Sequence, residues 1–454
     1  MKFLRRIVLG GDPIDSQQAR WEFLGALSLW SCLCLLIAAV VIARAAGASL
    51  FLSNYDGREL ALVYVVVGLA VVAIIYGLSW LTHGVQYDRV AIGTIAILAV
   101  GTAAFRLAIP ATLRGDRNWV FGAMYVFLET LVLVTTMQVW TLANSLFNSA
   151  QAKRLYVFIA SGGIFGSILG GAATRSFAYL STTNLLWIVV GLCPPMIVAI
   201  RVFRKQARHL RRVVVKDQLS LDHAQESLDH TNPFLWIRHP ALRQRRVFRM
   251  ASRLSLLAFL VTFTTNLIDF YFKTYADEQF HGDTLSLTQF FGSFYVLVGC
   301  VSLGMQVLIT PLIVRNSSLF VGLALTPLVL SAGTLLNVLG AGLVRATFLK
   351  LCDSGFAHSV HRCCTEMLYT PLPSNVTGEI KLLAEGVAGR AGLVSSGLLL
   401  WILAYRFQPI HSLELISVLL VLWFVALALL KNTYRAVEPT PMANPISESA
   451  KRAA

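Results

Sequence analysis

The sequence predicts an all-α membrane protein with twelve transmembrane helices in two six-helix halves, and three observations support this. Hydrophobic residues make up 56% of the 454 residues and charged residues only 13%, with a mean hydropathy of +0.67. Apolar runs of about 20 residues, the length that crosses a bilayer as a helix, recur along the chain. A single long hydrophilic interval, residues 206–248, divides these runs into two equal sets.

Apolar runs bounded by polar turns predict each helix in order, and no β-strand is required. The first half, residues 1–205, contains the predicted helices 21–46, 59–81, 89–110, 118–146, 154–180 and 184–205. The second half, residues 249–436, contains the predicted helices 249–275, 286–313, 317–340, 343–368, 379–405 and 411–432. We expect the tail at 437–454, which is rich in Pro, Ser and Ala, to be disordered.

The 206–248 interval is a basic linker, bounded by RKQARHLRRVVVK and RHPALRQRR. Most of the 38 Lys and Arg residues fall on the same predicted side as this linker and both termini, so the positive-inside rule places that side in the cytoplasm. The net charge of +15 therefore reflects membrane topology. The expected partner is the lipid bilayer, and nucleic acid is not expected.

The stretch from Leu343 to Gly392 carries the most unusual chemistry, because it places many charged side chains inside apolar segments, where they mark functional pathways. Lys350 and Asp353 are three residues apart and share one helical face. Mutual neutralisation of the two is one interpretation, and contact with a solute is the other. Asp353 and, in the first half, Glu129 each lie near the middle of a predicted helix, which indicates a faint repeat.

Glu129 has no charged neighbour in the sequence, so it either bonds to another helix or serves as a coupling or solute-contact residue. Arg253 and Arg390 are candidate anion contacts, because a guanidinium matches phosphate and carboxylate geometry, although either could instead pair with an acid. Asp269 and Lys273 form a further opposite-charge pair, four residues apart.

Paired charges flank the turn at residues 369–380 and suggest a gate at the cytoplasmic side. Arg362 and Glu366 are four residues apart, as are Lys381 and Glu385. Such a network could latch one state of a rocking transporter, and the alternative is ordinary solvated helix-end chemistry.

Gly162, Gly166 and Gly170 form a repeated small-residue face, which predicts close helix packing. The sequence contains no nucleophile elbow, phosphate loop, HExxH or dinucleotide fingerprint in a credible context. We therefore expect no enzyme activity, no cofactor and no metal site.

Three segments resemble the bacterial and plastid ATP/ADP translocase family or its short relatives, within the major facilitator superfamily. The segment VWTLANSLFNSAQAKRLYVFIASGGIFGSILGG resembles a family motif in which a Trp and an Ala-Asn pair precede Ala-Lys-Arg. The matching residues here are Trp140, Ala143, Asn144, Ala152, Lys153 and Arg154. The segment EMLYTPLPSNVTGEIKLLAEGVAGRAG is similar to that family's proline-containing turn and Gly-rich helix, and NPFLWIRHPALR to its shorter facilitator-type relatives. The resemblance implies alternating access in a bacterial inner (plasma) membrane.

One departure from the family bears on the solute. Where the exchangers have Arg-Asp-x-Lys-Asp, this chain has Arg44-Ala45-Ala46-Gly47-Ala48, so only the arginine remains. A polyphosphate needs several cations to replace its water shell. We therefore expect a secondary transporter of a small organic anion or nucleotide-like solute. The alternatives are a non-transporting sensor or assembly factor on the same fold, and a true ATP/ADP exchanger.

Overall fold

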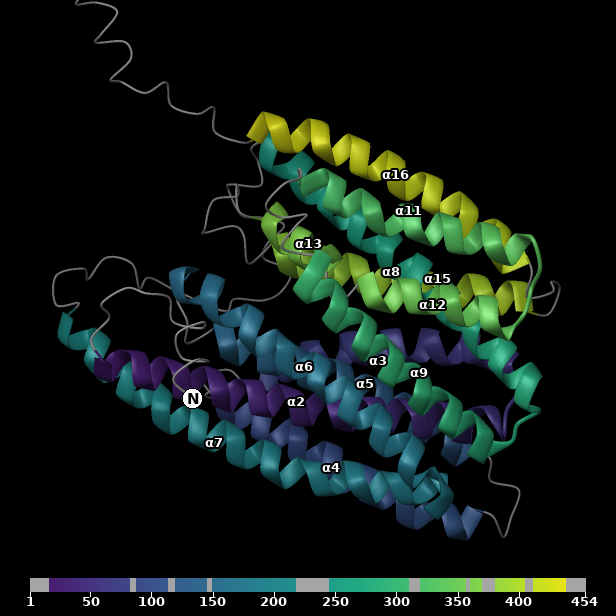
Figure 1. The fold of residues 1–454 in the computed structure, drawn as a ribbon, viewed down its shortest axis with the longest axis horizontal. Coiled ribbons are helices and arrows are strands. Elements are labelled where there is room, and N and C mark those ends of the chain that lie inside the picture. Colours follow the sequence, from purple (N-terminus) through teal and green to yellow (C-terminus); the bar gives the residue numbers. More distant parts are fainter. Residues whose placement is uncertain are drawn as a thin grey trace, which may run out of the picture.

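The computed structural model describes residues 16–81, 87–112, 119–144, 149–217, 245–309, 319–356, 360–369, 380–404 and 411–437. Within these ranges the chain is built from helices and short helical turns (Figure 1). The predicted disordered tail at 437–454 lies outside the described residues from 438 onward.

The first half is formed by six long helices with three short 3₁₀ turns between them. They are α2 (Ser16–Leu52), η1 (Gly57–Glu59), α3 (Leu60–Leu81), α4 (Tyr87–Thr112), α5 (Trp119–Asn144), α6 (Ser149–Phe177), η2 (Ala178–Leu180), η3 (Thr182–Asn184) and α7 (Leu185–Asp217). Each long helix overlaps one of the six predicted spans.

The second half contains six further spans, three of which include a π-helical or broken segment. The elements are α8 (Arg245–Phe280), α9 (Thr284–Gly304) with η6 (Met305–Ile309), α11 (Leu319–Val338), α12 (Leu343–Phe356) with α13 (Arg362–Leu368), η8 (Leu382–Ala388) with α15 (Gly389–Ala404), and α16 (His411–Val437). The twelve-helix prediction is thereby confirmed. Both ends of the predicted 206–248 linker are helical, because α7 runs to Asp217 and α8 begins at Arg245.

Ten helices in the described part of the chain are long and apolar enough to cross a membrane. The two other spans contain α6 and α12. The Gly- and Ser-rich sequence of α6 lowers its hydropathy, and α12 is only 14 residues long and carries Arg345, Lys350 and Asp353. Both helices pack closely against their neighbours, α6 against α2 and α9, and α12 against α8 and α11.

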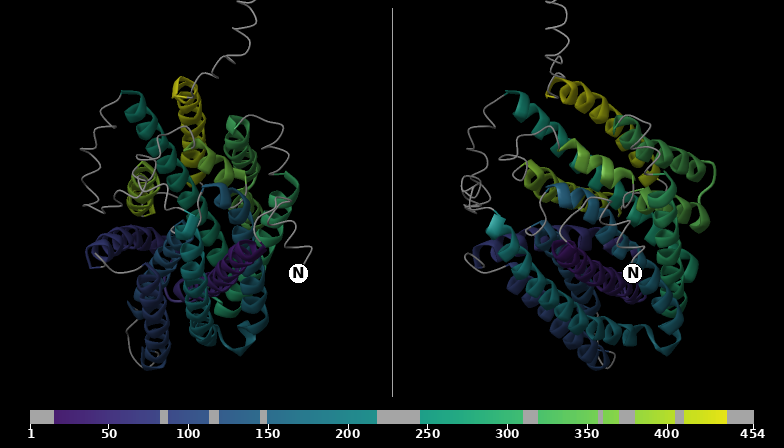
Figure 2. Two further views of the ribbon diagram at one scale, coloured as in Figure 1. Left: turned by 90° about the vertical axis from the view of Figure 1, so that its left-hand side faces the viewer. Right: turned by 60° about the vertical axis from the view of Figure 1, so that its left-hand side comes forward.

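The two halves have largely separate hydrophobic cores, although parts of the first half pack into the core of the second. One core cluster is formed mainly by α2, α4, α5, α6 and α7, and the other mainly by the helices of the second half. Helix α3 contributes its buried side chains, including Leu60 and Val67, to the second cluster, and so do Phe51 near the end of α2 and Tyr125 on α5. In Figure 1 most of the second half (green to yellow) lies above the first (purple to teal), whereas α9 runs down beside α6 and α2. Figure 2 shows the bundle from two further sides, with α16 (yellow) at the top.

Helix α6 packs tightly against α2 through the three glycines of its small-residue face. A Cβ atom at Gly162, Gly166 or Gly170 would lie under 3.0 Å from the carbonyl oxygens of Trp30, Cys34 and Ala38, respectively. These three carbonyls are four residues apart on α2, as the glycines are on α6. Only glycine permits the two backbones to approach this closely.

One end of the helix bundle is closed by contacts between the halves, and we call it the Ser53 end. The hydroxyls of Ser53 and Thr284 lie 2.6 Å apart, and those of Thr182 and Thr288 lie 2.8 Å apart. The backbone N–H of Gly57 donates to Asp277 Oδ2 at 3.2 Å. The opposite end, which includes Lys381, is the Lys381 end. The C-terminal end of α7 and the N-terminal end of α8 lie here, and the predicted linker joins them.

Candidate functional site

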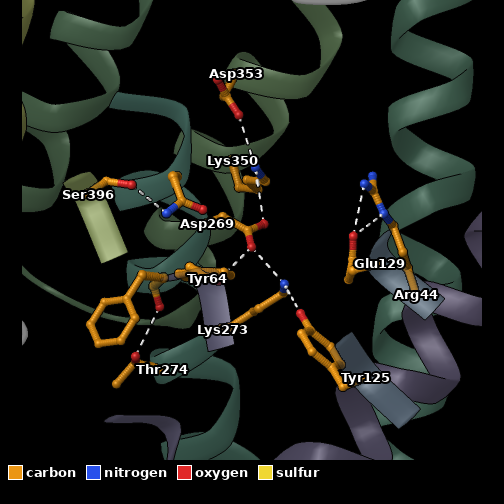
Figure 3. Close-up of polar contacts among 12 residues, drawn as sticks. Arg44, Tyr64, Tyr125, Glu129, Asp269, Lys273, Thr274, Lys350, Asp353 and Ser396 are labelled. Carbon is orange, nitrogen blue, oxygen red and sulfur yellow. Dashed lines mark hydrogen bonds and ion pairs between the residues drawn. The ribbon is translucent and has the colours of Figure 1, made fainter. Parts of the chain in front are cut away.

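Seven charged side chains lie between the two halves near the middle of the helices, and we call them the central charge cluster. Figure 3 shows six of them. The cluster consists of Arg44 on α2, Glu129 on α5, Asp269 and Lys273 on α8, Lys350 and Asp353 on α12, and Arg390 on α15. The charges come from distant parts of the sequence, so the fold brings them together.

The first half contributes one ion pair to the cluster. Glu129 Oε2 accepts from Nε of Arg44 at 3.1 Å and forms an ion pair with Nη2 of Arg44 at the same distance. Glu129 therefore bonds to another helix, and its role as a coupling or solute-contact residue stays a prediction. This bond leaves its second oxygen, Oε1, outside the pair, and the Glu129 side chain is 14% exposed.

The second half contributes a chain of three ion pairs. Asp269 accepts from Lys273 Nζ at 2.6 Å and from Lys350 Nζ at 3.2 Å, and Lys350 also lies 3.0 Å from Asp353. Thr265 donates to the other oxygen of Asp353 at 2.8 Å. Lys350 is therefore shared between two carboxylates, which offsets the cost of burying all three groups in a membrane.

Two tyrosines connect the halves at the cluster. Tyr64 on α3 donates to Asp269 at 2.8 Å, and Lys273 donates to the hydroxyl of Tyr125 on α5 at 2.7 Å (Figure 3). Lys273 also lies over both tyrosine rings, 5.6 Å and 5.5 Å from their centroids. Cation–π contacts of this kind hold an ammonium group at a defined position.

Arg390 differs from the other cations of the cluster. It lies directly after the π-helical segment η8, a type of irregularity that is frequent at functional sites. Its Nη2 contacts Met137 Sδ at 3.7 Å, its buried Nε has no hydrogen-bond partner, and no carboxylate lies at ion-pair distance within the described residues. It interacts electrostatically with Arg44, which repels it, and with Glu385.

The structure places Arg253 away from the cluster. Its guanidinium donates to the carbonyl of Leu429 and to the hydroxyl of Thr433, both on α16. These bonds hold α8 and α16 together inside the second half. Arg253, a candidate anion contact in the sequence, therefore does not join the central charge cluster, whereas Arg44 and Lys273 do.

The charges predicted to form a gate are only partly described. Lys381 Nζ donates to both oxygens of Glu366, at 2.9 Å and 2.7 Å. This partner differs from the predicted one, Glu385, and the bond lies within the second half. Arg362 begins α13, and its side chain lies outside the described part of the chain.

A cavity of about 510 Å³ lies at the Ser53 end, separate from the central cluster. Its lining includes Tyr55, Arg58, Asp277 and His281. It adjoins the contacts that close this end, so it belongs to the closed junction between the halves.

Sequence comparisons decide the family. The profile of the TLC ATP/ADP transporter family matches residues 105–353, which is more than half of the chain. The chain belongs to the TLC ATP/ADP transporter family. The matched region runs from α4 to Asp353, and so contains Glu129, Asp269, Lys273 and Lys350.

Curated relatives of this TLC-family protein include two proteins named ADP,ATP carrier protein 3. The one from Rickettsia bellii is 22% identical over 348 residues, which cover 68% of each chain. The one from Rickettsia typhi is 21% identical over 349 residues, with the same coverage.

Solved structures support the fold. A mutant of the nucleoside transporter NupG has a TM-score of 0.58 at 14% identity and covers 91% of this chain and 98% of its own. The xylose transporter XylE from E. coli has a TM-score of 0.59 at 14% identity and covers 89% and 98%. The family and the major facilitator fold make this chain a multi-pass membrane secondary transporter, as the sequence predicted.

Proposed function

We propose that this transporter carries a nucleotide-like anion of one or two negative charges, held between Arg44 and Arg390. The observation that carries the proposal is the guanidinium of Arg390, which is buried without a carboxylate at ion-pair distance in the described part of the chain. Arg44 of the other half adds a second guanidinium to the same cluster. An anion between the two guanidiniums would offset their like charges and satisfy unused donors on both.

The charge of the cluster limits the charge of the solute. Its four cations, Arg44, Lys273, Lys350 and Arg390, face the three carboxylates of Glu129, Asp269 and Asp353. The resulting excess is one positive charge, which suits a monoanion or dianion. A triphosphate would need several of the carboxylates to give up their cations, and each buried carboxylate so released is costly.

The nucleotide-like part of the proposal is supported by the relatives, which are named as ADP,ATP carriers. Their names also favour the second candidate, a true ATP/ADP exchanger. A non-transporting sensor is less well supported, since that function would favour complete pairing of the central charges, and Arg390 is left without an ion-pair partner in the described region.

Our proposal also includes the orientation and the gate. Both termini and the 206–248 interval would lie on the cytoplasmic side of a bacterial inner membrane. The Ser53 end would then face outward, so that the structure is closed to the outside. Glu366 and Lys381, with Arg362 and Glu385, would latch the Lys381 end in the opposite state. Their partners would then have to change, because the observed pair joins two helices of one half.

The proposal is tested by thermal stabilisation of the purified full-length protein with adenosine, AMP, ADP and ATP. We expect AMP to raise the melting temperature more than ATP, and Arg390→Gln to abolish the AMP effect. Glu278→Gln, an exposed change on α8 beyond the cluster, serves as the control and should retain it. A larger ATP effect that survives Arg390→Gln would overturn the proposal in favour of the exchanger.

A further inference from the structure

Every ion pair of the central charge cluster is formed within one half of the protein. Arg44 and Glu129 both belong to the first half. The pairs of Asp269 with Lys273 and Lys350, and of Lys350 with Asp353, belong to the second half. In alternating access the halves move largely as rigid bodies, so these pairs would persist in both states.

Contacts that cross between the halves at the cluster involve uncharged groups of the first half. The neutral hydroxyl of Tyr64 donates a hydrogen bond to Asp269, and the neutral hydroxyl of Tyr125 accepts one from Lys273. When the halves separate, Asp269 retains both lysines and Lys273 retains Asp269. Rocking of the halves therefore breaks hydrogen bonds to tyrosine hydroxyls but leaves no carboxylate without its cation.

The pairing of the cations decides whether the protein can change between its two states without a bound solute. A transporter whose cations lack partners when empty must bury uncompensated charge in order to change state, and this restricts it to one-for-one exchange. Here three of the four cations of the cluster retain carboxylate partners without a solute. Only the fourth, Arg390, has no carboxylate at ion-pair distance among the described residues, so the empty cluster leaves one cation uncompensated and not four.

We infer that Asp269 and Glu129 act as built-in counter-anions that let the empty protein reorient, so that it moves its solute in net flux as well as by exchange. The two residues are positioning residues, because they act through the cations that they hold. The inference rests on the proposed function and adds the mode of transport to it.

The test uses proteoliposomes and labelled AMP, with vesicles either empty or preloaded with unlabelled AMP. The wild-type protein should take up AMP into empty vesicles as well as into preloaded ones. Asp269→Asn leaves Lys273 without a carboxylate, so the ratio of exchange to net uptake should rise at least about tenfold. Asp269→Glu, which restores the carboxylate, should return the ratio toward the wild-type value.

Glu129→Gln provides an independent second variant, because it releases Arg44 in the other half and should raise the same ratio. Glu278→Gln, with the same loss of one carboxylate on α8, should leave the ratio unchanged. A structural defect would lower exchange and net uptake together, whereas the loss of a counter-anion lowers net uptake selectively.

The outcomes separate the two proposals. Wild-type uptake into preloaded vesicles only would overturn the counter-anion inference and leave the proposed function intact. Unchanged ratios in both Asp269→Asn and Glu129→Gln, or an equal loss of both activities, would also overturn the inference. Absence of AMP movement under either condition would overturn the proposed function and the inference with it.

Discussion

Arg44 on α2 donates from Nε to Oε2 of Glu129 on α5 at 3.1 Å, and its Nη2 forms an ion pair with the same oxygen at the same distance. The pair joins two helices that are far apart in the sequence, and the Arg44 side chain is 34% exposed. Because the partial exposure weakens the pair, Glu129→Gln should lower the free energy of unfolding by about 1–2 kcal/mol, less than for a fully buried pair.

A double-mutant cycle measures this pair directly, by thermal unfolding in detergent. Arg44→Gln combined with Glu129→Gln should destabilise the protein by less than the two single changes added together, because the double variant leaves no charge uncompensated. Strictly additive effects would show that the two side chains do not interact.

The approach of α6 to α2 depends on glycine. A Cβ atom at Gly166 would lie under 3.0 Å from the carbonyl of Cys34, so Gly166→Ala should destabilise the protein by about 1–3 kcal/mol. Gly191 on α7 is the matched control, since nothing lies within 4 Å of a Cβ added there. Gly191→Ala should be neutral or stabilising by up to about 1 kcal/mol. Equal melting temperatures for the two variants would contradict the packing account.

Much of the fold follows from the sequence, because apolar length and polar turns are local properties. All twelve predicted spans overlap helices of the structure, and the spacing of Gly162 and Gly166 matches the contact with α2. The pair of Lys350 with Asp353, three residues apart on one helix, is also a local feature. The helix irregularities η6 and η8 have no such local signal.

The composition of the central cluster depends on tertiary structure and was predicted only in part. Asp269 and Lys273 form a pair visible in the sequence, but their contact with Lys350 requires α8 and α12 to be adjacent. Arg44 was identified only as the remaining arginine of a family pattern. Arg253 has the same residue type and a similar apolar context, yet it faces α16. Only the packing of whole helices distinguishes the two arginines.

Membrane orientation provides a separate prediction. Reporter fusions after Arg212, near the end of α7, and at the C-terminus should both register as cytoplasmic, because basic residues are concentrated on that side. A single fusion reporting the outer side would contradict the predicted topology of both termini.

The proposed gate predicts a change in accessibility at the Lys381 end. Glu366→Gln removes the partner of Lys381, and it should shift the protein toward states open at this end. A cysteine at Met137, which contacts Arg390, would report the shift as faster labelling from the cytoplasmic side in a background without native cysteines. Glu385→Gln should act in the same direction, and Glu278→Gln at the other end should not. Unchanged labelling in both gate variants would show that the pair of Glu366 and Lys381 is an ordinary solvated contact at helix ends and not a gate.

The central claim is that a solute of low charge binds at Arg390, and transport in proteoliposomes tests it most directly. With the wild-type protein, exchange of labelled ATP for ADP should not exceed that of protein-free vesicles. Labelled AMP should be taken up, and Arg390→Gln should remove this uptake because the guanidinium that has no carboxylate partner in the described chain is lost. Robust ATP/ADP exchange that persists in Arg390→Gln would contradict both the charge balance of the cluster and the role of Arg390.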